Sequence, residues 1–142
     1  MSNDFITAFR GSFTSTLRWH QLDALWRVVR DDVRDDWYVY AVGEAPPRTP
    51  SSHGELLRFI DEVDVLLRRE HEEDFCGIVY ADDLARPSLI KIYDPNNLGV
   101  VCGYSENPPL PGWVLSRLPP ADLPAAQAPP KNRRRWWQRR FE

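Results

Sequence analysis

The chain has 142 residues and a net charge of −3, with 42% hydrophobic and 12% aromatic residues. This length suits one domain with some chain left over, and the composition allows a core of large side chains. No stretch approaches the roughly 18 consecutive apolar residues of a membrane-spanning helix. Two cysteines make no disulfide scaffold, and no basic segment leads into an apolar run at the start, so we expect a cytoplasmic protein.

The net charge hides a separation between the body of the chain and its end. Residues 131–142 hold six basic residues and one acid, a net charge of +5, which leaves −8 on the other residues. A body this acidic repels phosphate and does not fit an ordinary nucleic-acid-binding domain. We therefore expect one globular α+β domain at 1–118, a Pro/Ala-rich linker at 119–130, and a basic, aromatic tail at 131–142.

The first half of the chain predicts two long helices. Apolar residues recur at steps of three and four within 16–34, and the Ser/Thr run at 14–16 would cap this helix. A second helix is expected over 52–70, because Ser52 and Glu55 form a capping-box pattern ahead of another apolar stripe. Phenylalanines spaced four apart near the N-terminus indicate a short helix or a docked arm.

Strands are predicted between and after these helices. Residues 37–42 and 76–81 are apolar runs without a polar face, typical of strands covered on both sides, and the first is expected to be central. Residues 89–104 indicate a hairpin about a turn at 94–97, and 113–118 a last strand.

These elements together predict the fold. A strand–helix–strand unit favours a parallel pair, and the later strands favour an antiparallel meander. We therefore expect an α+β, two-layer fold with a mixed sheet of about five strands. Two main helices would pack on one face of that sheet, and the C-terminal tail would be disordered.

Carboxylates follow the predicted strand at 76–81. Asp82 and Asp83 lie at its end, and Asp94 is the nearest further acid. Paired carboxylates can share a proton or bind magnesium, so these acids, with or without a thiol, support an alternative interpretation as a small enzyme. The simpler interpretation is an ordinary polar turn with Arg86 as a partner.

The cysteines and histidines do not form a recognisable site. Cys76 and Cys102 lie in predicted strands, which supply no helix N-terminus to stabilise a thiolate, so two small buried hydrophobes are expected rather than a redox pair or a nucleophile. The three histidines, His20, His53 and His71, lack the spacing of a zinc site, and His53 is expected to be exposed. We predict no catalytic residue, no metal and no cofactor.

Motifs of nucleotide enzymes and hydrolases are also absent. The chain has no glycine-rich phosphate loop and no Gly-x-Ser-x-Gly elbow, so we infer no small-molecule substrate. Tyr104 and Trp113 flank a proline-rich bend, a composition typical of surfaces that bind extended peptides. With Asp82 and Asp83 they form a secondary candidate surface. The alternative is a proline-stiffened loop with Trp113 in the core.

The sharpest functional signal is the tail at 131–142. It interleaves five arginines with three aromatic residues: Arg133, Arg134, Arg135, Trp136, Trp137, Arg139, Arg140 and Phe141. Burial of a large apolar side chain gains about 1.5–3 kcal/mol, and Trp and Arg are frequent hot-spot residues, so we expect the tail to dock on an acidic, apolar groove of a partner protein. An anionic membrane, a nucleic acid and the chain's own acidic body are the alternatives. The expected function is a non-enzymatic interaction, adaptor or assembly factor.

Overall fold

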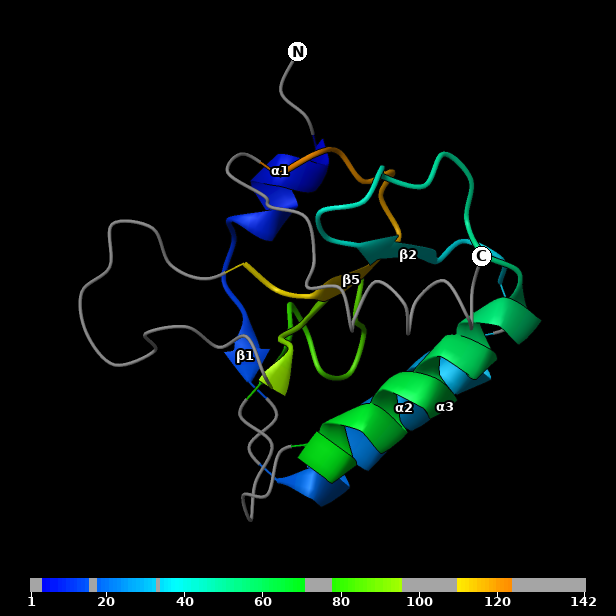
Figure 1. The fold of residues 1–142 in the computed structure, drawn as a ribbon, viewed down its shortest axis with the longest axis vertical. Coiled ribbons are helices and arrows are strands. Elements are labelled where there is room, and N and C mark those ends of the chain that lie inside the picture. The colour runs from blue at the N-terminus through cyan, green and yellow to red at the C-terminus, as the bar shows by residue number, and fades with distance from the viewer. Residues whose placement is uncertain (1–3, 16–17, 33, 71–77, 96–109, 124–142) are drawn as a thin grey trace, which may run out of the picture.

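The computed structural model describes residues 4–15, 18–32, 34–70, 78–95 and 110–123 (Figure 1). The elements follow the order α1 (Asp4–Phe9), β1 (Thr14–Ser15), α2 (Trp19–Asp31), β2 (Tyr38–Ala41), α3 (His53–Glu70), β3 (Val79–Ala81), β4 (Leu89–Ile92) and β5 (Trp113–Ser116). The predicted α+β class is confirmed. None of the helices in these ranges is long and apolar enough to cross a membrane.

Helix α3 begins as its sequence predicts. The backbone N–H of Glu55 donates to Ser52 Oγ at 3.2 Å, and the N–H of Ser52 is 3.5 Å from Glu55 Oε1, which closes the capping box. The N–H of His53 donates to Asp35 Oδ1 at 2.9 Å. The first turn of α3 therefore has side-chain acceptors from two separate segments.

Helix α2 is shorter than predicted at both ends. Its first residue is Trp19, and the N–H of Arg18 donates to Gln21 Oε1 at 2.9 Å. The N-cap residue is Arg18 rather than one of the Ser/Thr residues expected at 14–16, and the first two of those residues form β1. At the other end, Asp32 already has extended backbone angles.

Helices α2 and α3 pack side by side and antiparallel (Figure 1). Trp26 Nε1 donates to Asp64 Oδ1 at 3.1 Å, and Arg68 Nε donates to Asp64 Oδ2 at 2.9 Å. Arg68 also pairs with Asp23 and lies 4.9 Å from the centre of the Trp19 ring. One carboxylate, that of Asp64, thus joins a tryptophan of α2 to an arginine of its own helix.

The sheet is antiparallel rather than mixed. Strands β3, β4, β5 and β2 lie side by side in that order, and the two-residue β1 pairs with β3. The predicted parallel pair of β2 and β3 is wrong, because β5 and β4 lie between them, and β2 is at an edge rather than in the centre. An apolar run marks a strand but carries no information about its partner. The second arm of the predicted hairpin, at 100–104, lies outside the described residues, and β4 pairs with β5 instead.

One face of the sheet packs against α2 and α3, and we call this cluster the helix-side core. Its sheet residues include Val79, Ile90, Ile92 and Leu115. Its helix residues are Leu22, Leu25, Trp26, Val29, Leu56, Phe59, Ile60, Val63, Leu66 and Leu67. All ten of these side chains are at most 2% exposed, so α2 and α3 together cover this face of the sheet.

The opposite face carries a second cluster, the arm-side core. It consists of Phe5, Tyr40, Val42, Leu89, Val114 and Leu123. The Phe5 ring of α1 meets the Tyr40 ring of β2 edge-on, with centroids 6.2 Å apart. Helix α1 therefore packs on the sheet face opposite to α2 and α3. The apolar run at 37–42 is covered on both sides as predicted, since Tyr40 and Ala41 belong to different cores.

Candidate functional site

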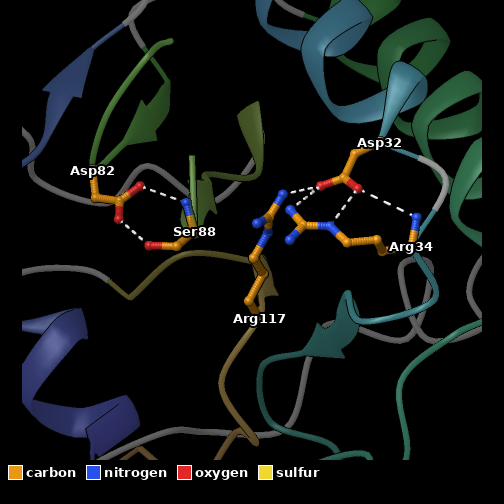
Figure 2. A network of polar contacts seen from close by, with 5 residues as sticks. All are labelled: Asp32, Arg34, Asp82, Ser88 and Arg117. Atoms are coloured by element: carbon orange, nitrogen blue, oxygen red, sulfur yellow. Dashed lines mark hydrogen bonds and ion pairs between the residues drawn. The ribbon is translucent and has the colours of Figure 1, made fainter. Parts of the chain in front are cut away.

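The acids at the end of β3 organise a turn. Asp82 Oδ1 accepts the backbone N–H groups of Asp83 at 3.0 Å, Ser88 at 2.9 Å and Leu89 at 3.1 Å. Its second oxygen, Oδ2, accepts the Ser88 hydroxyl (Figure 2). This carboxylate thus has four donors and ties the end of β3 to the start of β4.

Asp83 has a similar role within the same loop. Its Oδ1 accepts the backbone N–H of Ala85 at 2.8 Å and of Arg86 at 3.0 Å. Hydrogen bonds from the N–H of Arg86 and then of Ala85 lower the pKa of the Asp83 carboxyl, because they favour its charged form. A carboxylate with a lowered pKa is a poor general base, so Asp83 fits the polar-turn interpretation. Asp82 fits it through its four hydrogen bonds within the turn.

A second polar group joins this turn to α2. Arg34 donates to both oxygens of Asp32, from Nε and Nη2 at 2.9 Å each, and Arg117 Nη2 donates to Asp32 Oδ2 (Figure 2). The backbone N–H of Arg117 donates to the Ser88 carbonyl at 3.0 Å. We call Asp32, Arg34, Asp82, Ser88 and Arg117 the strand-end cluster.

Arg117 is the cation at the centre of the strand-end cluster. Its guanidinium lies 4.9 Å from the centre of the Trp37 ring, and its side chain is 26% exposed. Burial lowers the pKa of Arg117 from its usual value, and its guanidinium contacts the Asp32 carboxylate. The cluster therefore holds the end of β5 against the end of α2, which is a structural role.

The remaining members of the predicted enzyme site lie elsewhere. Asp94 follows β4 and is 5% exposed, whereas Asp82 precedes that strand, and four residues of strand span about 13 Å. Asp94 therefore lies at the opposite end of β4 from Asp82 and Asp83, so the structure does not bring together the three acids named in the alternative interpretation. Cys76 and Cys102 lie outside the described residues. No group of three metal-ligating side chains comes together within the ranges that are described.

The predicted secondary surface is also divided. Trp113 is 4% exposed and belongs to the helix-side core, so it does not offer its ring to a peptide. It opens β5 at the end of the sheet away from Asp82 and Asp83. Tyr104 lies outside the described residues. Trp113 lies in the core, as the alternative interpretation has it, whereas residues 104–109 of the proline-rich bend lie outside the described residues.

The tail predicted to bind a partner lies outside the described residues as well. These residues are Arg133, Arg134, Arg135, Trp136, Trp137, Arg139, Arg140 and Phe141. The described chain ends at Leu123, which is 5% exposed and packs into the arm-side core. The last described residue is therefore anchored, and seven residues separate it from Lys131.

Sequence reasoning missed the environment of two residues. His53 is half-buried rather than exposed, with its Nδ1 atom shielded from solvent. Lys91 lies in β4 on the arm-side face, where its Nζ atom is 4.1 Å from the centre of the Phe9 ring and 4.0 Å from that of Phe13. The alternation of Leu89, Lys91 and Tyr93 was the available signal, because it places a cation between two apolar residues on one strand face.

Comparison of the chain with models of protein families gives no match, and neither the curated proteins nor the solved structures give a significant one.

Proposed function

We propose that this protein is a non-enzymatic cytoplasmic interaction, adaptor or assembly factor whose tail at 131–142 captures a partner protein. The observation that carries the proposal is the composition of the tail, in which five arginines alternate with Trp136, Trp137 and Phe141. Arginine and tryptophan are the residues most enriched in interface hot spots. Their combination fits a groove that is both acidic and apolar.

Contacts within the described domain support the proposal that partner binding belongs to the tail rather than to the domain. Its strand-end carboxylates are occupied by turn N–H groups and by arginine, so they are poor candidates for acid–base chemistry. Both sheet faces have cores built from residues up to Leu123. Such a domain would act as a stable base, and the seven residues 124–130 would let the tail reach about 22 Å if extended.

The partner experiment compares three forms of the full-length chain in a pull-down from cell extract with identification of the captured proteins. They are the native chain, the Trp136→Ala/Trp137→Ala/Phe141→Ala variant, and the Arg133→Lys/Arg134→Lys/Arg135→Lys variant. We expect the aromatic variant to lose a defined partner, because it no longer buries its rings, and the lysine variant to keep part of the binding, because it retains the charge. A partner held equally by all three forms contradicts the proposal.

The alternatives for the tail are separated by direct binding. Single-stranded nucleic acid and vesicles rich in phosphatidylserine are the two probes, each tested at low and high salt. Binding through arginine and phosphate weakens steeply with salt, whereas docking by tryptophan burial weakens much less. Tight, salt-sensitive binding to either probe without a protein partner would replace the proposed function by a tether to that surface.

A further inference from the structure

The chain turns where β5 ends. Ser116 is fully buried, and its Oγ atom accepts the backbone N–H of Leu118 at 3.0 Å and donates to the Leu118 carbonyl at 2.8 Å. Pro119 and Pro120 follow, and each has a fixed φ angle and no backbone donor. The direction in which the chain leaves the sheet is therefore set within a few residues of β5.

Beyond that turn, packing against the arm-side core holds the chain. Within the described part of the molecule, residues 119–123 make no backbone–backbone hydrogen bond. Ala121 is partly buried against the arm-side core, and Leu123 is 5% exposed within it. Burial, and then the charge of Asp122, raises the pKa of the Tyr40 phenol, so Asp122 also lies close to this core. The end of the described chain is therefore anchored mainly by side chains.

Helix α1 belongs to the same cluster. Its Phe5 is 1% exposed and meets the Tyr40 ring, and Ile6 packs at the edge of the cluster. Figure 1 shows the end of the described chain, in orange, beside α1. This helix is part of the segment at 4–15, which we call the N-terminal arm. A helix of six residues is too short to be stable alone, so α1 also depends on this packing.

Two short segments therefore stabilise each other in one small core. If α1 detaches, Leu123 loses part of its cover, and if residues 119–123 detach, Phe5 loses part of its own. The helix-side core contains no residue of either segment and can remain intact in both cases. Local opening of this kind requires less free energy than unfolding of the whole domain.

We propose that α1 and residues 119–123 form a clamp at the base of the tail, and that this clamp opens as one unit while the helix-side core stays folded. With the clamp closed, the seven residues 124–130 separate the tail from its anchor and span at most about 22 Å. With the clamp open, the twelve residues 119–130 do so and span at most about 37 Å.

The length of a tether sets both the reach and the effective concentration of the binding segment that it carries. The clamp therefore regulates how far from the domain the tail can engage a partner. This last step rests on the function proposed above, whereas the opening of the clamp does not.

Native-state proteolysis tests whether α1 holds the base of the tail. Endoproteinase Asp-N cuts before aspartate, so its rate at the bond between Ala121 and Asp122 in the full-length chain reports the open population. We expect Phe5→Ala to raise this rate about tenfold or more, because it weakens the closed clamp and not the open one. Thr7→Ala, on the exposed side of α1, is the matched control and should leave the rate unchanged. An unchanged rate in the Phe5 variant overturns the proposal.

A variant of the helix-side core separates local opening from unfolding of the whole domain. Val63→Ala destabilises that core, but Val63 keeps its contacts when the clamp alone opens. We therefore expect this variant to speed cleavage before Asp61 in α3 and not before Asp122. Equal acceleration at both bonds would mean that only global unfolding releases the end of the described chain, and it would overturn the proposal.

The coupling must also act in the opposite direction. Leu123→Ala should speed hydrogen exchange at the amide of Arg10, which donates to the Ile6 carbonyl of α1 at 3.1 Å, by a similar factor. An Arg10 amide that does not respond would show two independent contacts and no clamp. None of these measurements involves a partner, so failure of the clamp is distinguishable from failure of the tail to capture one.

Discussion

The two faces of the sheet are closed in different ways. The helix-side core packs two helices of 13 and 18 residues on the sheet, and every side chain in the cluster is apolar. The arm-side core is closed by a helix of six residues and by segments from other parts of the chain, and Lys91 points into its edge. The helix side therefore has an ordinary apolar core, whereas the arm side has the Lys91 ammonium in contact with aromatic rings at its edge.

The difference indicates which face of the sheet contributes most to the stability of this domain. Burial scales with apolar area, and the helix side supplies most of the fully buried side chains. The arm side is attached through fewer residues and is therefore expected to open at lower free energy. Substitutions on the two faces test this asymmetry.

The largest effect is expected from Phe59→Ala in α3. Phe59 is fully buried in the helix-side core, so its loss should lower the free energy of unfolding by about 3–5 kcal/mol. Phe5→Ala is the matched change on the arm side, where the short helix can relax, and we expect it to cost about 2 kcal/mol. Urea unfolding measures both, and equal losses would mean that the two cores are equally integrated.

The next effect concerns the polar contacts between α2 and α3. Asp64→Ala removes the acceptor of Trp26 Nε1 and of Arg68 Nε, so it should cost about 1–3 kcal/mol. The control is Asp61→Ala, which breaks an exposed pair with Arg30 and should cost less than about 1 kcal/mol. If thermal unfolding shows the same loss for both, the Asp64 contacts add nothing beyond surface charge.

A smaller effect is expected at the strand-end cluster. Asp82→Ala leaves the N–H groups of Ser88 and Leu89 without their acceptor, and we expect a loss of about 1–2 kcal/mol. Amide hydrogen exchange should quicken at those two residues in particular. Asp83→Ala is the neighbouring control with a smaller cost, and unchanged exchange in the Asp82 variant would contradict the role of the turn.

The smallest effect is a pH dependence on the arm side. Burial, and secondarily the Asp122 charge, raises the pKa of Tyr40, so the unfolded chain loses this proton before the folded one. The stability that the neutral phenol contributes is complete below about pH 10 and is lost as pH rises through the folded-state pKa. Tyr40→Phe should therefore make stability fall less steeply above pH 10 in urea titrations. An unchanged slope would show that this phenol is not the group responsible.

Local sequence signals predicted the helices better than the sheet. The capping box of Ser52 and Glu55 placed the start of α3 to within one residue, because its partners lie three positions apart. The pairing of β2 with β5 joins Tyr38 to Ser116, and no local signal encodes a contact so distant in the chain. The positions of β2 to β5 and the antiparallel direction of the later strands could therefore be predicted, whereas the strand order, the partner of β2 and the short β1 could not.

The candidate sites show the same limit. Composition grouped Trp113 with Asp82 and Asp83, but register places them at opposite ends of the sheet. The environment of Lys91 depends on rings that reach it from the N-terminal arm, which no spacing rule connects to β4. The polar-turn interpretation of Asp82 succeeded because all its partners lie within seven residues.

The place of β5 between β4 and β2 has a consequence for how this chain acquires its fold during synthesis. Both ladders that join β2 to β4 require Trp113–Ser116, the last strand among the described residues. Until that strand is available, β2 has no ladder partner, and β3 and β4 form only a small antiparallel unit with β1. Closure over so long a loop is entropically slow, so a nascent or truncated chain ending before residue 113 would leave β2 and one edge of β4 without the partner strand that they share.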